Sequence, residues 1–126
     1  MEPVYLFSLV NQHRSWLSAR QAALAQNIAN ANTPGYKALD IAQFTTALDD
    51  RALQMASSSP LHMTTSSPDG RGPAQKPGET WETTHSGNSV SLEHEMIKSG
   101  EVRGAFSLDT NILKAFHGMW LASVKG

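Results

Sequence analysis

The sequence contains no cysteine and no long apolar run, and it carries almost no net charge. Without cysteine the chain can form neither disulfides nor thiolate metal sites. No stretch approaches the roughly 18 apolar residues that a membrane-spanning helix requires, so no such helix is expected. Ten basic and eleven acidic residues are scattered along the chain and give a net charge of -1. This distribution does not indicate a nucleic-acid-binding face.

The amino terminus also lacks the features of a cleaved secretory signal. It begins with Met1-Glu2, and no Lys or Arg precedes Arg14. The apolar stretch from Val4 to Val10 is interrupted by Ser8. A signal peptide needs a basic start, an unbroken apolar segment and a small-residue cleavage site. Taken by itself, the sequence therefore predicts a cytoplasmic protein without general secretory export.

Large apolar residues are scarce and unevenly distributed. Only 40% of the 126 residues are hydrophobic and 7% are aromatic, which is too few for a large compact core. Between Ser57 and Ser91, 21 of 35 residues are Ser, Thr, Pro or Gly, a composition typical of loops, extended chain or short strands. The regular structure is therefore expected at the two ends.

The residues that catalysis or metal binding requires form no recognisable pattern. The histidines are isolated and show neither an HExxH motif nor a paired spacing suited to zinc. In Glu93-His94-Glu95, adjacent side chains would point to different faces of a helix and would not converge on one ion. No GxSxG motif, glycine-rich phosphate loop or cysteine nucleophile occurs. We predict no catalytic residue, no metal site and no cofactor.

Two long amphipathic helices are predicted, one at each end. The first should run from Pro3, which suits a first helical turn, to about Ala31. The last should run from Ser89 or Val90 toward Val124. In both, apolar residues recur at helical spacing, and the two stripes consist of Phe7, Val10, Leu17, Leu24 and Ile28 in the first helix and of Leu92, Met96, Phe106, Leu113, Phe116 and Trp120 in the last.

Neither helix is expected to be stable alone. Gly100, Gly104 and Gly118 lie inside the last helix, and each costs about 1 kcal/mol relative to alanine at an interior helical position. A long helix in water draws most of its stability from burying its apolar stripe. We therefore predict that both ends become well ordered when they pack against other chains.

The segment LAQNIANANTPGYK, from Leu24 to Lys37, predicts a helix end followed by a chain reversal. Asn30 and Asn32 tolerate left-handed backbone conformations, and Pro34-Gly35 suits the centre of a type II turn. Asp40 could cap a second helix, and the apolar residues after the turn have the spacing of one helical face: Ile41, Phe44, Leu48 and Met55.

The chain is accordingly divided into three parts. Residues 1–33 form the first helix, residues 34–88 hold the turn, a short helix over about 40–56 and an extended middle, and residues 89–126 form the last helix. The middle has room for a short β-hairpin.

The turn segment resembles a motif of the bacterial flagellar axial proteins, the family of rod and hook subunits, in which a sequence close to NIANxxTPGYK follows the first helix. Nine positions match, namely Asn27, Ile28, Ala29, Asn30, Thr33, Pro34, Gly35, Tyr36 and Lys37.

A second segment, GNSVSLEHEM from Gly87 to Met96, resembles the GNxVxLExEM pattern that opens the last helix in proximal rod members of this family. Ser91 stands where the family often has Asp. Gly104-Ala105-Phe106 stands where a Tyr-containing segment is common.

The resemblance implies a mainly α fold in which the two terminal helices pack antiparallel, as in a coiled coil, around a Ser/Pro/Gly-rich and mostly irregular middle. It also implies a structural subunit of the proximal rod of the flagellar basal body, which polymerises through its helix stripes into a tubular drive shaft and supports motility. The implied partners are copies of the chain, other rod proteins, the ring/rod junction protein and the export gate.

The family leaves the cytoplasm through the flagellar type III export apparatus with an uncleaved amino-terminal signal, which would place the chain in the periplasmic rod. Val4 to Val10 is then a candidate for recognition by the export gate, although the same residues also suit a helix core. Two alternative functions remain open: a neighbouring rod subunit, and a soluble helical module that binds or regulates a partner.

Overall fold

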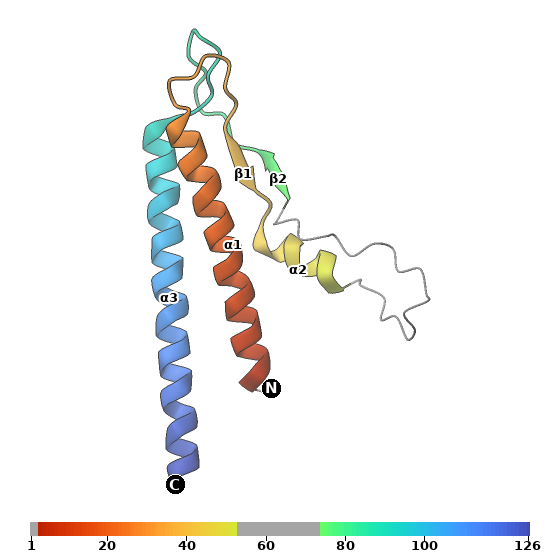
Figure 1. Cartoon of the computed structure of the whole chain (residues 1–126), viewed down its shortest axis with the longest axis vertical. Coiled ribbons are helices and arrows are strands. Elements are labelled where there is room, and N and C mark those ends of the chain that lie inside the picture. Colours follow the sequence, from red (N-terminus) through yellow and green to blue (C-terminus); the bar gives the residue numbers. More distant parts are fainter. Residues whose placement is uncertain (1–2, 53–73) are drawn as a thin grey trace, which may run out of the picture.

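A computed structural model describes residues 3–52 and 74–126 of the chain. Two long helices, α1 (Pro3–Ala29) and α3 (Leu92–Lys125), lie side by side and antiparallel, so the amino end of α1 and the carboxyl end of α3 point the same way (Figure 1). A two-stranded antiparallel sheet of β1 (Leu39–Ile41) and β2 (Gln75–Pro77) and the helix α2 (Phe44–Ala52) lie to one side of this pair. The mainly α fold with antiparallel terminal helices is confirmed.

The first helix begins at Pro3 as predicted and ends at Ala29, two residues before the predicted end. The Asn30 N–H is shared between the carbonyl oxygens of Gln26 and Asn27, at 3.2 and 3.1 Å, and the next N–H, of Ala31, bonds to Ile28. These shorter-range bonds tighten the last turn and stop the α-helical pattern.

The last helix begins at Leu92, after the predicted Ser89 or Val90. The backbone N–H groups of Ser89 and Val90 bond instead to the Tyr36 carbonyl oxygen and to Asn88 Oδ1, so these two residues are held extended. Glu93 and Glu95 lie in the first helical turn, where their charges oppose the positive end of the helix dipole.

The predicted short helix over about 40–56 is wrong at its start. Residues Leu39–Ile41 form β1, which pairs antiparallel with β2 so that Ile41 lies opposite Gln75, and α2 begins only at Phe44. Ile41 therefore does not share a helical face with Phe44. Its helical spacing is overridden because the Asp40 side chain accepts the Ile41 N–H at 2.8 Å and the strand pairing occupies its neighbours. Met55 and the rest of the predicted helix lie outside the described residues.

The chain reversal after α1 has the features of the predicted type II turn. Gly35 has a φ of 72°, which favours glycine, and the Tyr36 N–H donates to the Thr33 carbonyl oxygen at 3.2 Å. The Gly35 N–H is also used, because it donates to the Ser86 carbonyl oxygen at 2.9 Å. The turn is therefore tied to the segment that precedes α3.

The core is narrow and lies between α1 and α3. Leu17, Leu24 and Val102 form its buried centre, and partly buried residues pack around them: Trp16, Ala105 and Phe106. Toward the amino end of α1 and the carboxyl end of α3, the rings of Phe7 and Phe116 meet edge to face with centroids 5.6 Å apart. Within residues 3–52 and 74–126, no helix is long and apolar enough to cross a membrane.

Candidate assembly site

Asn88, which lies four residues before α3, holds the end of α1. Its side chain is 1% exposed, and its Nδ2 atom donates to three backbone carbonyl oxygens at 2.9, 3.0 and 2.7 Å, those of Asn30, Ala31 and Thr33. These three residues belong to the turn that follows Ala29, the last residue of α1. Asn88 therefore fixes the chain where it leaves α1, from the opposite end of the sequence.

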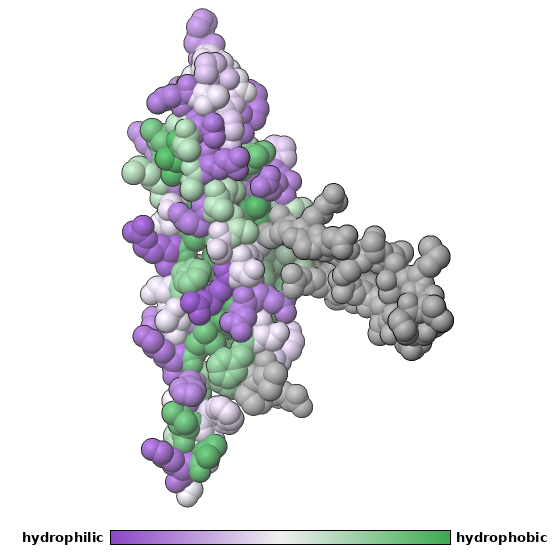
Figure 2. All heavy atoms as spheres, viewed as in Figure 1, coloured by the Kyte–Doolittle hydropathy of each residue, from purple (hydrophilic) through white to green (hydrophobic). Residues whose placement is uncertain are grey.

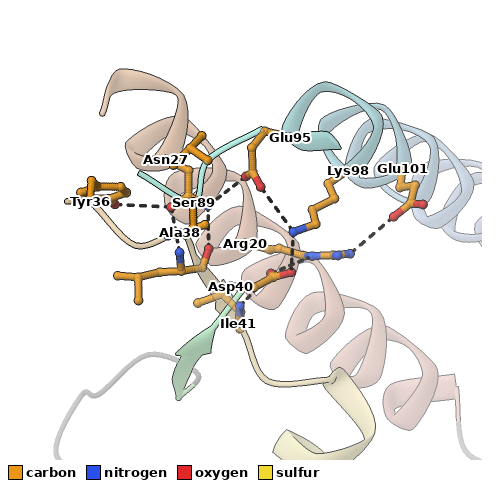
Figure 3. A network of polar contacts seen from close by, with 12 residues as sticks. Arg20, Asn27, Tyr36, Ala38, Asp40, Ile41, Ser89, Glu95, Lys98 and Glu101 are labelled. Atoms are coloured by element: carbon orange, nitrogen blue, oxygen red, sulfur yellow. Dashed lines mark hydrogen bonds and ion pairs between the residues drawn. The ribbon is translucent and has the colours of Figure 1, made fainter. Parts of the chain in front are cut away.

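Asn27 connects α1 to the other two elements of the corner. It is fully buried. Its amide pairs with the backbone of Leu39, accepting the N–H at 3.0 Å and donating to the carbonyl oxygen at 2.7 Å. The same Nδ2 group donates to Glu95 Oε2 at 2.9 Å (Figure 3). One side chain of α1 thus contacts both β1 and α3.

The two motif segments also bond directly to each other. The Ser89 N–H donates to the Tyr36 carbonyl oxygen at 3.0 Å, and the Ser89 hydroxyl accepts the Ala38 N–H at 2.9 Å. Lys37 Nζ donates to the Gly87 carbonyl oxygen at 2.9 Å. The segments from Asn27 to Lys37 and from Gly87 to Met96 therefore form one interlocked corner at the end of the helix pair, which we call the motif corner.

A chain of charged groups extends from the motif corner along the helix pair (Figure 3). Lys98 Nζ lies 3.4 Å from carboxylate oxygens of both Glu95 and Asp40, and Arg20 Nε lies 3.2 Å from Asp40 Oδ1. Glu95 and Lys98 are 2% and 6% exposed. Two carboxylates and two cations are thereby balanced, as buried charges require.

The pKa of Asp40 shows how this balance works. Burial by itself would raise the pKa of the Asp40 carboxyl. The hydrogen bond from the Ile41 N–H, the hydrogen bond and charge of Arg20, and the charge of Lys98 together outweigh burial and hold the pKa below its ordinary value. Asp40 is therefore ionised at neutral pH and anchors β1 to both helices.

A second cross-link lies further along the helices. His13 Nδ1 of α1 and Asp109 Oδ2 of α3 are 2.7 Å apart. The His13 ring stacks on Trp16, and Trp16 Nε1 donates to the Ala42 carbonyl oxygen at 2.8 Å, just before α2. The register of α1 against α3 is therefore set at two points.

These polar groups are occupied with one another. Among the described residues, every buried side-chain nitrogen or oxygen has a hydrogen-bond partner. The same residues contain no group of three His, Asp or Glu side chains that could hold a metal ion. The arrangement suits rigid positioning of two helices.

The apolar stripes that the sequence predicts divide into two groups. Val10, Leu17 and Leu24 are buried within the chain, and four further residues are partly buried, namely Phe7, Phe106, Leu113 and Phe116. The others remain exposed, namely Ile28, Leu92, Met96 and Trp120. Whether the exposed residues contact a neighbouring subunit stays a prediction.

Further exposed apolar residues on α3 were not identified from the sequence. Ile97, Leu108, Ile112 and Met119 are 38% to 62% exposed, and Leu121 and Val124 near the end of α3 are also exposed. Figure 2 shows apolar residues at the surface of this carboxyl end. The first four are separated by 11, 4 and 7 residues, which are about three, one and two helical turns, so a search for these spacings would have found them.

The sequence also missed the roles of Asn88 and of the Glu95–Lys98 pair. Asn88 and Glu95 lie in the second motif, but there they could be explained as a helix cap and as a charge near the helix dipole. The only signal of their burial was the motif itself, because polar residues carry no periodic pattern of their own.

Residues 15–37 match the sequence model of a family described as flagella basal body rod protein. This range includes the nine motif positions from Asn27 to Lys37 that build one half of the motif corner. The chain is also similar to the flagellar basal body rod protein FlgB of Agrobacterium fabrum (strain C58). The identity is 37% over 129 aligned residues, which cover 99% of this chain and 96% of that protein.

Proposed function

This chain belongs to the FlgB family of flagellar basal body rod proteins, and from this premise we propose how it acts. It is a structural rod subunit of the basal body. We propose that copies polymerise through their terminal helices, with each other and with other rod proteins, into the tubular shaft of the proximal rod and thereby support motility.

The observation that carries this proposal is the apolar surface of α3. Met96, Met119 and Val124 are 70%, 62% and 73% exposed, and together with the other exposed residues they line a helix that α1 covers on one side only (Figure 1). An exposed apolar surface that is larger than usual for a single subunit is typical of protein-protein contacts. Assembly into the rod would remove it from water.

The motif corner supports the same function in a different way. It holds α1 and α3 antiparallel and in one register within a single chain, and its central side chains, Asn27, Asn88 and Glu95, are buried. A subunit that is already ordered loses less conformational entropy when it binds. Every copy would therefore present the same surfaces to its neighbours.

The division of labour along the chain follows from this arrangement. We propose that residues 1–33 and 89–126 form the rod core, and that residues 34–88 form the middle region, whose elements β1, β2 and α2 lie to one side of the helix pair (Figure 1). The middle would then contact the surroundings of the rod, such as the ring/rod junction protein.

We propose that the chain acts without catalysis, metal or cofactor. The charged residues near the motif corner neutralise one another and touch the backbone of β1. None of them is left with an unpaired buried group to activate a substrate.

Export is proposed to follow the flagellar type III route without a cleaved signal, with delivery to the periplasmic part of the rod. Val10 is buried against the rest of the chain and Phe7 is partly buried. If the export gate reads the segment from Val4 to Val10, it would therefore bind it before the chain folds.

The test is fractionation of basal bodies from cells that express a tagged chain. The rod function requires that the chain stay in detergent-resistant basal bodies, and that deletion of its gene abolish filaments and motility until the full chain is restored. A soluble regulatory module would wash away with detergent. A different rod position would be revealed if the chain restores motility to cells that lack a neighbouring rod subunit.

A further inference from the structure

One face of α3 carries four large apolar residues, with Glu101 and Gly104 between the first and the second. At about 100° per residue, Ile97, Leu108, Ile112 and Met119 fall within about 60° of one another and about 80° to 140° from the core residue Val102. All four are exposed. We call these four apolar residues the α3 row. Glu101 lies on the same face of α3, between Ile97 and Leu108, and its carboxylate is 3.9 Å from Arg20 Nη1 of α1.

The outward face of α1 has the opposite character. Seven small, uncharged and exposed residues alternate at intervals of three and four, namely Ser8, Asn11, Ser15, Ser18, Ala22, Ala25 and Ala29. The two arginines of α1 turn away from this face. The Arg14 guanidinium lies 4.7 Å from the centroid of the Phe106 ring, and Arg20 bonds to Asp40. We call these seven residues the α1 face.

The absence of charge on this face is informative. Between residues 5 and 29, where side chains are described, no exposed position of α1 is occupied by Lys, Arg, Asp or Glu. A helix that faces water carries charged or strongly polar groups on its solvent side. The α1 face is therefore suited to being covered, and covering it removes no ion from water.

The two surfaces lie on opposite sides of the helix pair. On α1, Trp16, Arg20 and Asn27 face the side on which β1 lies, and the α1 face lies away from them. On α3, Glu101 lines the same groove as Lys76 of β2 and Glu79. The α3 row therefore lies on the side of the two-stranded sheet. One copy therefore cannot bring its own two surfaces together.

We propose that the α3 row of one copy packs against the α1 face of a second copy. Large apolar side chains would enter the shallow positions between small residues, as ridges enter grooves between packed helices. The inference rests on the proposed polymerisation and adds which two surfaces meet.

This pairing has two geometric consequences. Because the two surfaces differ, the contact is heterologous, and a repeated heterologous contact that does not close produces an open helical assembly. Because copies in such an assembly share one orientation, α3 of one copy runs antiparallel to α1 of the next. Contacting residue pairs would then share nearly the same sum of residue numbers.

The absence of cysteine allows a direct test by disulfide cross-linking. Ala115 lies within the arc of the α3 row. It is exposed and small, so Ala115→Cys disturbs little. Two chains of different tag length would be expressed in one cell, one with Ala115→Cys and the other with a single cysteine at one of the seven α1 face positions. Basal bodies would be isolated, oxidised and separated by size without reductant.

We expect a disulfide between the two chains for one or two adjacent α1 positions only. Residues three or four apart on a helix are separated by about 5 Å, and a disulfide requires Cα atoms about 4.4 to 6.8 Å apart. Ala122→Cys, seven residues further along α3, should shift the reactive α1 position by about seven residues toward the amino terminus. His117→Cys, which is exposed and lies about 160° around α3 from Ala115, is the matched control and should not react with any of them.

Three outcomes would overturn the inference while leaving the rod function intact. They are a disulfide between two Ala115→Cys chains, a disulfide to a different rod protein, and incorporated variants without any disulfide to the α1 face. Incorporation of each cysteine variant is measured first on immunoblots of basal bodies. If the unmodified chain itself is missing from basal bodies, the proposed function fails instead.

Discussion

Replacement of Asn88 by alanine should destabilise the chain more than any other single asparagine change outside α1. The substitution removes two amide hydrogens that bond to carbonyl oxygens of the turn after α1 and one oxygen that accepts the Val90 N–H at 2.8 Å. A typical hydrogen bond contributes about 1 kcal/mol net, and a buried group left without a partner costs about 1 to 3 kcal/mol. We expect a loss of about 3 kcal/mol in the free energy of unfolding.

The loss is measured by urea unfolding of the purified chain, followed by far-ultraviolet circular dichroism. For a chain of this size, about 3 kcal/mol corresponds to a fall in Tm of roughly 10 °C. Hydrogen exchange supplies a local measurement that does not depend on two-state unfolding. The amide of Val90 should exchange much faster in Asn88→Ala, because its acceptor has been removed.

Asn32→Ala is the matched control. Asn32 lies in the same corner, two residues before Pro34, but it is exposed, so its replacement should change the free energy of unfolding by less than about 0.5 kcal/mol. The reasoning is refuted if Asn88→Ala and Asn32→Ala have equal effects, or if the exchange rate of Val90 is unchanged.

Three further predictions concern the turn, the α3 surface and the charged groups. Replacing Pro34-Gly35 by Ala-Ala should impair incorporation into basal bodies, because alanine is strained at the φ of 72° that Gly35 adopts; normal incorporation on immunoblots would contradict a role for the turn. Trp120→Asp, at a half-exposed position, should block incorporation while secretion into the medium or periplasm stays measurable, and unimpaired incorporation would mean that this part of α3 is not an interface. Because the pKa of Asp40 is lowered in the folded chain, its ionised form stabilises the fold fully above the ordinary Asp pKa of 3.8, and this contribution is lost as the pH falls through the lower folded value. The urea midpoint of the unmodified chain should therefore fall more steeply below about pH 4 than that of Asp40→Asn, and identical pH profiles would contradict the assignment.

Much of the fold could be predicted because its signals are local. Helical spacing of apolar residues, proline at the start of α1, and the Thr-Pro-Gly sequence at the turn each act over a few residues. The two motifs indicated the family, and both halves of the motif corner come from them. The motifs did not indicate that they bond to each other. Asn88 binds carbonyl oxygens of the turn after α1, almost 60 residues earlier in the sequence.

Contacts between distant segments decided what local spacing could not. Ile41 has helical spacing to Phe44, but strand pairing with Gln75, far along the chain, places it in β1. Of the predicted stripes, Leu17 and Leu24 are buried in a cluster with Val102 of α3, while contact of the stripes with a neighbouring subunit stays a prediction. In both cases a partner distant in sequence decided which side of a segment is buried.

The sequence by itself determined that two amphipathic helices flank a polar middle and that a turn follows the first helix, because these properties depend on backbone preferences and on spacing within short segments. The family was indicated by the resemblance of its two motifs to those of the rod and hook proteins. Only the tertiary structure decided which apolar residues form the core and which remain exposed on the α3 row. It also decided that Glu95 and Lys98 are buried as a pair, since their burial depends on Asn27 and Asp40, more than 50 residues away.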